Sequence, residues 1–117
     1  MKYTETHEWI EEQGSAATVG VSDYAQKELG DIVYIELPQK GIQVKAGDVV
    51  CVLESTKAAA DVYSPVSGTI SAVNEKLKEQ PELINRSAES EGWIYKIQVS
   101  SPQELEKLLD KKEYYKK

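Results

Sequence analysis

The chain has 117 residues, 40% hydrophobic and 29% charged, and this size and balance are typical of one globular domain. Its net charge of −6 disfavours nucleic-acid binding, and its single cysteine and single histidine are too few for a disulfide or a structural zinc site. No apolar run approaches the roughly 20 residues that span a bilayer, and the N-terminus lacks signal- or transit-peptide features, so a cytoplasmic protein without membrane contact is expected.

Short strands separated by turn residues are predicted in the first half of the chain. Gln13-Gly14-Ser15 separates two apolar-rich stretches, as the turn of a β-hairpin does. Ser22 can cap a helix, Gly30 can end one, and Pro38 cannot continue a central strand. The elements expected here are, in chain order, strands at 8–12 and 16–21, a short helix at 22–29 and a strand at 31–37.

The middle of the chain contains an apolar run, Val49-Val50-Cys51-Val52-Leu53, which predicts a strand buried on both faces. Cys51 in this run is expected to act as a small buried hydrophobe. Gly47 and Gly68 are interpreted as turn glycines with positive φ. Further elements are expected at 58–63 and 69–73 as strands, at 75–85 as a turn or helical fragment, and at 93–99 as a strand.

The C-terminal segment changes to a helical pattern. Ser101-Pro102-Gln103-Glu104 has the form of a capping box with proline at the first helical position. Leu105, Leu108 and Leu109 follow at the spacing of one helix face. A C-terminal helix over about 101–115 is therefore expected to dock on the strands, within a single domain of residues 1–117.

Lys57 is the first residue with a candidate chemical role. A tight turn between two apolar strands would place its amine at the tip, and its small neighbours would leave that amine open to a modifying enzyme. Lysine suits a swinging prosthetic group, because its stem is flexible and amide formation removes its charge. Spacing alone, however, favours an ordinary solvated lysine.

Several motifs of this chain change that balance. The segment from Glu54-Ser55-Thr56-Lys57-Ala58 to Ser64-Pro65-Val66-Ser67-Gly68 resembles the lipoylation segment of glycine cleavage H proteins. The resemblance extends over about residues 3–114 through further motifs in the same order: Thr6-His7-Glu8-Trp9, 19–26, 29–33, Glu36-Leu37-Pro38, 81–85 and Gly92-Trp93. The chain departs from the family at Thr56, where valine is usual, and over 86–92, which lacks a Pro-Tyr pair and bears on partner preference.

The resemblance implies a mainly β fold, a lipoyl/biotinyl-type barrel-sandwich hybrid with short helices and a C-terminal helix. It implies lipoate attached to Lys57 as N6-lipoyllysine by a lipoate ligase or a lipoyl/octanoyl transferase. It further implies a non-catalytic carrier of aminomethyl groups. Such a carrier serves glycine decarboxylase (P protein), aminomethyltransferase (T protein) and dihydrolipoamide dehydrogenase (L protein).

The same resemblance implies a cleft that shelters the loaded arm. Thr6, Glu8 and Asp61 match the family's cleft positions, and a carboxylate there would pair with the ammonium group that the arm carries. Ordinary surface charge is the alternative for Glu8 and Asp61. His7, a lone histidine beside Trp9, is expected to pack or to cap rather than to bind a ligand.

Other functions stay open at this stage. H-like proteins can pass lipoyl groups to 2-oxoacid dehydrogenase complexes, and the altered 86–91 loop is compatible with that role. A biotin carrier usually has methionine on both sides of the lysine, whereas Thr56 and Ala58 flank Lys57 here. A structural interaction module would remain if Lys57 proved unmodified. An enzyme is disfavoured, because no motif provides a nucleophile–histidine pair, a phosphate loop or a metal cluster.

Overall fold

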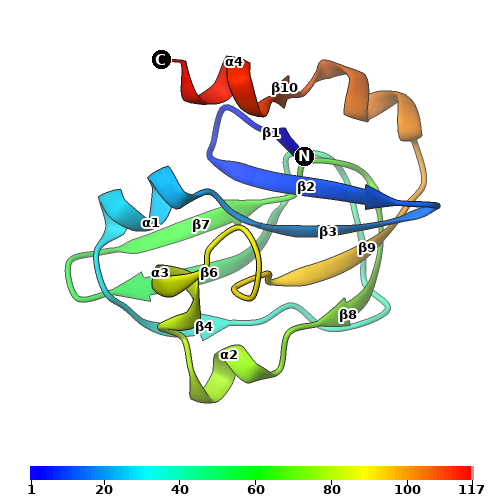
Figure 1. The fold of residues 1–117 in the computed structure, drawn as a ribbon. Coiled ribbons are helices and arrows are strands. Elements are labelled where there is room, and N and C mark those ends of the chain that lie inside the picture. Colours follow the sequence, from blue (N-terminus) through cyan, green and yellow to red (C-terminus); the bar gives the residue numbers. More distant parts are fainter. Residues whose placement is uncertain (117) are drawn as a thin grey trace.

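Two antiparallel sheets make up the computed structural model, which describes residues 1–116 (Figure 1). The larger sheet has the strand order β10-β1-β2-β3-β9-β8-β5, and the smaller has the order β4-β6-β7. The larger sheet contains β1 (Lys2–Tyr3), β2 (Glu8–Gln13), β3 (Ala16–Val21), β5 (Gln43–Val44), β8 (Gly68–Val73), β9 (Tyr95–Val99) and β10 (Leu109–Asp110), and the smaller contains β4 (Ile32–Glu36), β6 (Val49–Ser55) and β7 (Ala59–Tyr63). This architecture confirms the mainly β fold, and it is compatible with a barrel-sandwich although neither sheet closes on itself.

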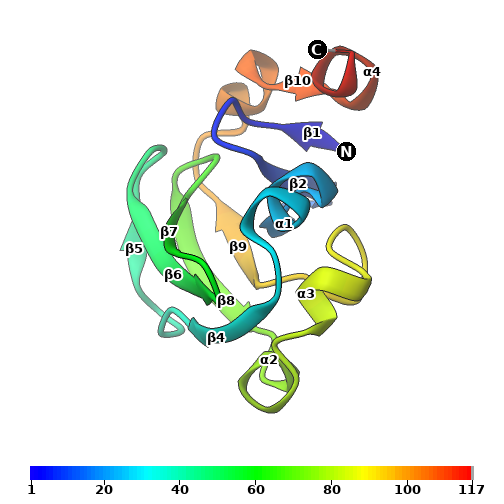
Figure 2. The ribbon, with the colours of Figure 1, turned by 90° about the vertical axis from the view of Figure 1, so that its left-hand side faces the viewer.

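Short helices cover the ends of the two sheets (Figure 2). The main core contains inward side chains of both sheets together with Leu77 and Ile84 from the helices below them. The helical elements are α1 (Asp23–Leu29), α2 (Lys76–Glu79), α3 (Leu83–Arg86), a 3-10 helix (Pro102–Lys107) and α4 (Lys111–Tyr115). Among residues 1–116, no helix is long and apolar enough to cross a bilayer.

Helix α1 begins and ends as its sequence predicts. The side chain of Ser22 accepts the N–H of Ala25 at 3.1 Å, which satisfies one of the free donors of the first turn. Gly30 has φ +82°, and its N–H donates to the carbonyl of Gln26 at 3.0 Å. Only glycine adopts this conformation without strain, so the chain leaves the helix at Gly30 and turns into β4.

The prediction that the 49–53 strand is buried on both faces is wrong. Cys51 and Leu53 are buried, but Val49 is 51% exposed and Val52 is half-buried. β6 is the central strand of the smaller sheet, and only one face of that sheet packs on the core. Continuous apolar sequence therefore marks a central strand here rather than burial on two sides.

Gly68 also differs from expectation, because the positive-φ glycines of residues 1–116 include Gly47 (φ +90°) but not Gly68. A Cβ atom on Gly68 would lie 2.1 Å from the carbonyl oxygen of Gln98. Glycine is needed at this position because β8 and β9 approach closely, not because of a left-handed turn.

The C-terminal segment is not the single helix expected over about 101–115. After the 3-10 helix, Leu108 becomes extended and Leu109 pairs with Tyr3 of β1. Asp110 then caps α4 through a reciprocal capping box with Glu113. Pairing with the edge strand β1 outweighs the local helical spacing, and it places α4 against the outer end of the larger sheet.

Candidate functional site

Strands β6 and β7 form a hairpin (Figure 1). Lys57 lies at its tip and is exposed. The side-chain oxygen of Ser55 accepts the N–H groups of Lys57 and Ala58, both at 3.1 Å, and donates to the carbonyl of Ala58 at 3.1 Å. The N–H of Thr56 donates to the carbonyl of Asp31 at 3.0 Å. Ser55 thus organises the turn, a role that goes beyond the small size noted from the sequence.

The stem of Lys57 lies over the end of α1. Its Cε atom is 3.0 Å from the position that a Cβ on Gly30 would occupy. Glycine is therefore favoured at position 30 for two reasons: the backbone has a positive φ, and the missing side chain leaves space for the stem of Lys57.

A pocket of about 260 Å³, here called the α1 pocket, lies beside α1. The turn before β2 provides Thr6 and His7, and β2 provides Glu8. The other lining residues are Val21, Tyr24, Ala25, Glu28, Leu29, Leu53, Ala60, Asp61 and Val62. The structure therefore brings Thr6, Glu8 and Asp61 together in one pocket. Lys57 does not line the pocket but lies next to Gly30, the residue that ends α1 after Leu29.

Glu8 is the most enclosed polar group of the α1 pocket, with 1% of its surface exposed. Its Oε1 accepts the hydroxyls of Thr4 and Thr6, both at 2.5 Å, and its Oε2 accepts the N–H of Tyr63 at 3.1 Å. Burial raises the pKa of Glu8, and these hydrogen bonds oppose that rise. A carboxylate has about four acceptor sites, so three donors leave roughly one for a further partner.

Asp61 contrasts with Glu8, because it is exposed on β7 opposite Val52. Its carboxylate has no hydrogen bond or ion pair with another group of residues 1–116 within the usual distances. The α1 pocket thus combines one internally satisfied carboxylate with one that is available to a cationic ligand.

His7 and the wall formed by α1 were not predicted as parts of this site. His7 has φ +76°, the only positive φ of a non-glycine residue in the described chain. Its ring lies 4.9 Å from that of Tyr24, which also lines the pocket. The helical spacing of Ala25 and Leu29 was the available signal for an apolar wall, but no local pattern links that wall to His7.

The remaining candidate residues take structural roles. Cys51 is buried, and burial raises the pKa of its thiol to about 12, which makes it a hydrophobe rather than a nucleophile. Trp9 is buried and donates to the carbonyl of Ala88 at 2.9 Å, whereas Trp93 is only half-buried. Within residues 1–116, no group of three or more His, Cys, Asp or Glu side chains could hold a metal ion.

Comparison with known proteins gives a consistent result over the whole chain. The glycine cleavage H-protein family matches residues 1–117. The glycine cleavage system H protein of Thermotoga maritima is 55% identical over 113 residues, which cover 97% of this chain and 91% of the relative. The probable glycine cleavage system H protein of Aeropyrum pernix is 54% identical, over 97% of this chain and 80% of the relative.

A solved structure supports the same assignment. The crystal structure of a glycine cleavage system H protein from Mycobacterium marinum superposes with a TM-score of 0.88 at 34% identity, over 98% of this chain and 93% of that one. The motif resemblance, the fold and these relatives agree. The chain therefore belongs to the glycine cleavage H-protein family, the lipoyl-bearing carriers of the glycine cleavage system.

Proposed function

We propose that this protein is a non-catalytic carrier that bears lipoate on Lys57 and shelters the loaded arm in the α1 pocket. The observation that carries the proposal is the convergence of Thr6 and Glu8 with Asp61, which is distant from them in sequence, beside the hairpin of Lys57. The matching family and relatives favour glycine cleavage over lipoyl relay to 2-oxoacid dehydrogenases. We also treat residues 1–117 as one carrier domain and the cytoplasm as its location.

The geometry of Lys57 supports covalent attachment there. The residue is exposed, its neighbours are small, and Ser55 holds the turn while the lysine side chain itself remains unpaired with any acid of residues 1–116. A lipoate ligase or a lipoyl/octanoyl transferase would reach the amine without unfolding the hairpin. Attachment at this tip would also start the arm at one end of α1.

The α1 pocket fits a lipoyl group by its chemistry. Val21, Leu29 and Leu53 provide apolar walls for hydrocarbon and sulfur, and Thr6 and Asp61 provide polar groups at the opening. When bound, the lipoyl group would supply dithiol–disulfide chemistry and carry an aminomethyl group. The exposed carboxylate of Asp61 would pair with the carried ammonium, while Glu8 would hold Thr4 and Thr6 in place.

This function requires partners that load, unload and reoxidise the arm. We propose glycine decarboxylase, aminomethyltransferase and dihydrolipoamide dehydrogenase for these tasks, because the chain belongs to the carrier family of that system. The exposed hairpin supports this proposal, since each partner must receive the same arm in its own active site.

The attachment site is tested by Lys57→Arg, which keeps the charge but cannot form the amide. Lys40→Arg, another exposed lysine in a turn, is the matched control. After incubation with a lipoate ligase, ATP and lipoate, wild type and Lys40→Arg should gain one lipoyl mass and Lys57→Arg none. A lipoyl adduct on Lys57→Arg would show that the arm is attached elsewhere.

A further inference from the structure

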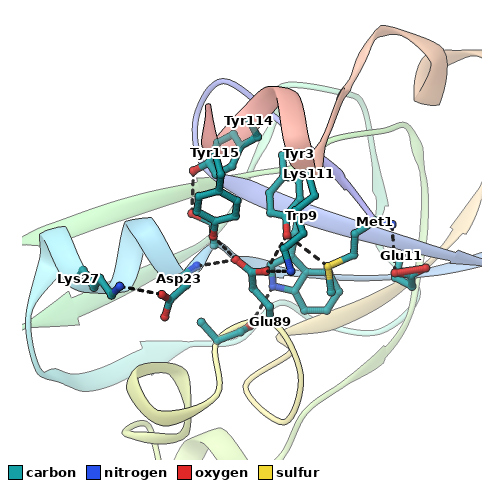
Figure 3. A network of polar contacts seen from close by, with 12 residues as sticks. Met1, Tyr3, Trp9, Glu11, Asp23, Lys27, Glu89, Lys111, Tyr114 and Tyr115 are labelled. Atoms are coloured by element: carbon teal, nitrogen blue, oxygen red, sulfur yellow. Dashed lines mark hydrogen bonds and ion pairs between the residues drawn. The ribbon is translucent and has the colours of Figure 1, made fainter. Parts of the chain in front are cut away.

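Tyr114 of α4 joins the C-terminal segment to the wall of the α1 pocket. Its side chain is 7% exposed, and its ring stacks on Tyr3 of β1 with 4.5 Å between the ring centroids (Figure 3). Its hydroxyl oxygen lies 2.6 Å from Nδ1 of His7 and 2.7 Å from the hydroxyl oxygen of Ser22. His7 lines the pocket, and Ser22 caps the helix that forms one wall. One hydroxyl thus contacts two parts of the same wall.

The direction of these hydrogen bonds follows from Ser22. Its oxygen accepts the N–H of Ala25, and its own proton needs an acceptor because the residue is fully buried. In residues 1–116 the hydroxyl oxygen of Tyr114 lies at hydrogen-bonding distance from this group. The Ser22 hydroxyl therefore donates its proton to the oxygen of Tyr114, and the Tyr114 hydroxyl donates its own proton to His7. Nδ1 of His7 is the acceptor, and its ring proton is on Nε2.

The backbone of His7 shows why such support is needed. A φ of +76° is unfavourable for a residue with a side chain, and strain of this kind persists where the surroundings determine it. The N–H of His7 donates to the carbonyl of Thr4 at 3.2 Å, and its carbonyl accepts the N–H of Ser22 at 2.9 Å. Tyr114 adds the contact that fixes the ring itself.

We infer that Tyr114 is a positioning residue of the α1 pocket, which holds His7 as the Nε2–H tautomer and ties this ring to the cap of α1. The inference rests on the proposed function of the pocket and deepens it. In this arrangement neither ring nitrogen of His7 has an unpaired acceptor site, because Nδ1 accepts from Tyr114 and Nε2 carries the proton. Nε2 can therefore donate a hydrogen bond but cannot accept one from the ammonium group of the carried load.

The tautomer can be measured directly, because His7 is the only histidine of the chain. In unlipoylated protein labelled with ¹⁵N-histidine, both ring nitrogen signals come from His7. The neutral ring of wild type should be predominantly Nε2–H, and Tyr114→Phe should populate both tautomers. Tyr115→Phe is the matched control, since it removes a hydroxyl from the same helix that binds Glu89 instead of His7. An Nδ1–H tautomer in wild type, or an unchanged ring in Tyr114→Phe, would overturn the inference.

Shelter is measured on the lipoylated, aminomethylated proteins. Loss of one neutral hydrogen bond should accelerate release of ammonia and formaldehyde by about three- to tenfold in Tyr114→Phe. Tyr115→Phe should stay within about twofold of wild type, since Glu89 still accepts the N–H of Asp23 at the start of α1 without the Tyr115 hydroxyl. Equal release from wild type and Tyr114→Phe would refute a role of Tyr114 in shelter.

A failure of the proposed function gives a different result. Wild type would then release its load as fast as free aminomethylated lipoamide does. The tautomer of His7 in the unlipoylated protein is independent of that result and decides the positioning role alone. Circular dichroism of Tyr114→Phe and Tyr115→Phe checks that both variants keep the fold, which the retained ring stack on Tyr3 supports.

Discussion

The Lys57 hairpin and the Glu8 side of the α1 pocket differ in how firmly the fold holds them. Lys57 is exposed, and the hydrogen bonds around it involve only the turn backbone, Ser55 and Asp31. Glu8 is fully enclosed and accepts three hydrogen bonds from three different residues. An attachment site must be reached by several enzymes, whereas a shelter must keep one shape. The two regions divide these requirements between them.

The largest expected difference between the regions is in stability. Glu8→Ala removes a buried side chain and leaves the partly buried donors of Thr4, Thr6 and Tyr63 without their acceptor, so we expect it to lower the free energy of unfolding by about 2–4 kcal/mol. Lys57→Ala removes an exposed side chain and should change it by less than about 0.5 kcal/mol. Urea unfolding of both variants gives the comparison, and similar values would contradict it.

The next difference concerns charge rather than stability. Asp61→Asn keeps the shape of an exposed side chain and removes its charge, so we expect normal lipoylation but roughly tenfold faster loss of the aminomethyl load. Asp48→Asn, on an exposed turn outside the α1 pocket, is the control and should release at the wild-type rate. Shelter would depend on packing alone if Asp61→Asn and wild type released equally fast.

Glu8 also predicts a pH dependence. Burial raises the pKa of Glu8 in the folded state above its ordinary value of 4.5. At a pH between these two pKa values, the folded protein binds a proton at Glu8 more strongly than the unfolded chain does. In this window the contribution of Glu8 to stability increases as the pH falls. Glu8→Gln lacks this contribution, so wild type should gain stability relative to Glu8→Gln as the pH falls from neutral towards 4.5. A constant difference between them in urea unfolding would show that Glu8 does not titrate in this way.

The smallest expected effect lies in the hairpin. Ser55→Ala removes the side chain that accepts two N–H groups of the turn, but these groups are exposed and can bind water. We expect a loss of about 0.5–1 kcal/mol in the free energy of unfolding and unchanged lipoylation of Lys57. Reduced lipoylation at unchanged stability would show that the modifying enzyme reads the ordered turn.

The sequence pattern was sufficient to predict the turns and helix ends that depend only on neighbouring residues. The turn at Gly14, the cap at Ser22 and the end at Gly30 were all predictable, because each depends on the residue's own conformational preference. The C-terminal helix was predicted wrongly, since pairing of Leu109 with Tyr3 joins opposite ends of the chain. Gly68 was interpreted wrongly for the same reason, because its constraint comes from Gln98 on another strand.

The candidate site shows the same limit. The turn position made Lys57 a candidate, but its selection as the attachment site and the grouping of Thr6, Glu8 and Asp61 depended on family resemblance and not on spacing. The contact of His7 with Tyr114 joins residues 107 positions apart, and no periodicity predicts it. The positions that carry the shelter are thus the ones that only the folded chain brings together.

The central claim is that an arm attached to Lys57 lies in the α1 pocket when it is loaded. Amide spectra of the lipoylated protein, recorded before and after aminomethylation, test this claim most directly. We expect the largest shifts at Thr6, Tyr24 and Asp61, with smaller ones at the hairpin. Shifts confined to residues 55–59 would contradict it, because the load would then remain in solvent beside its attachment point.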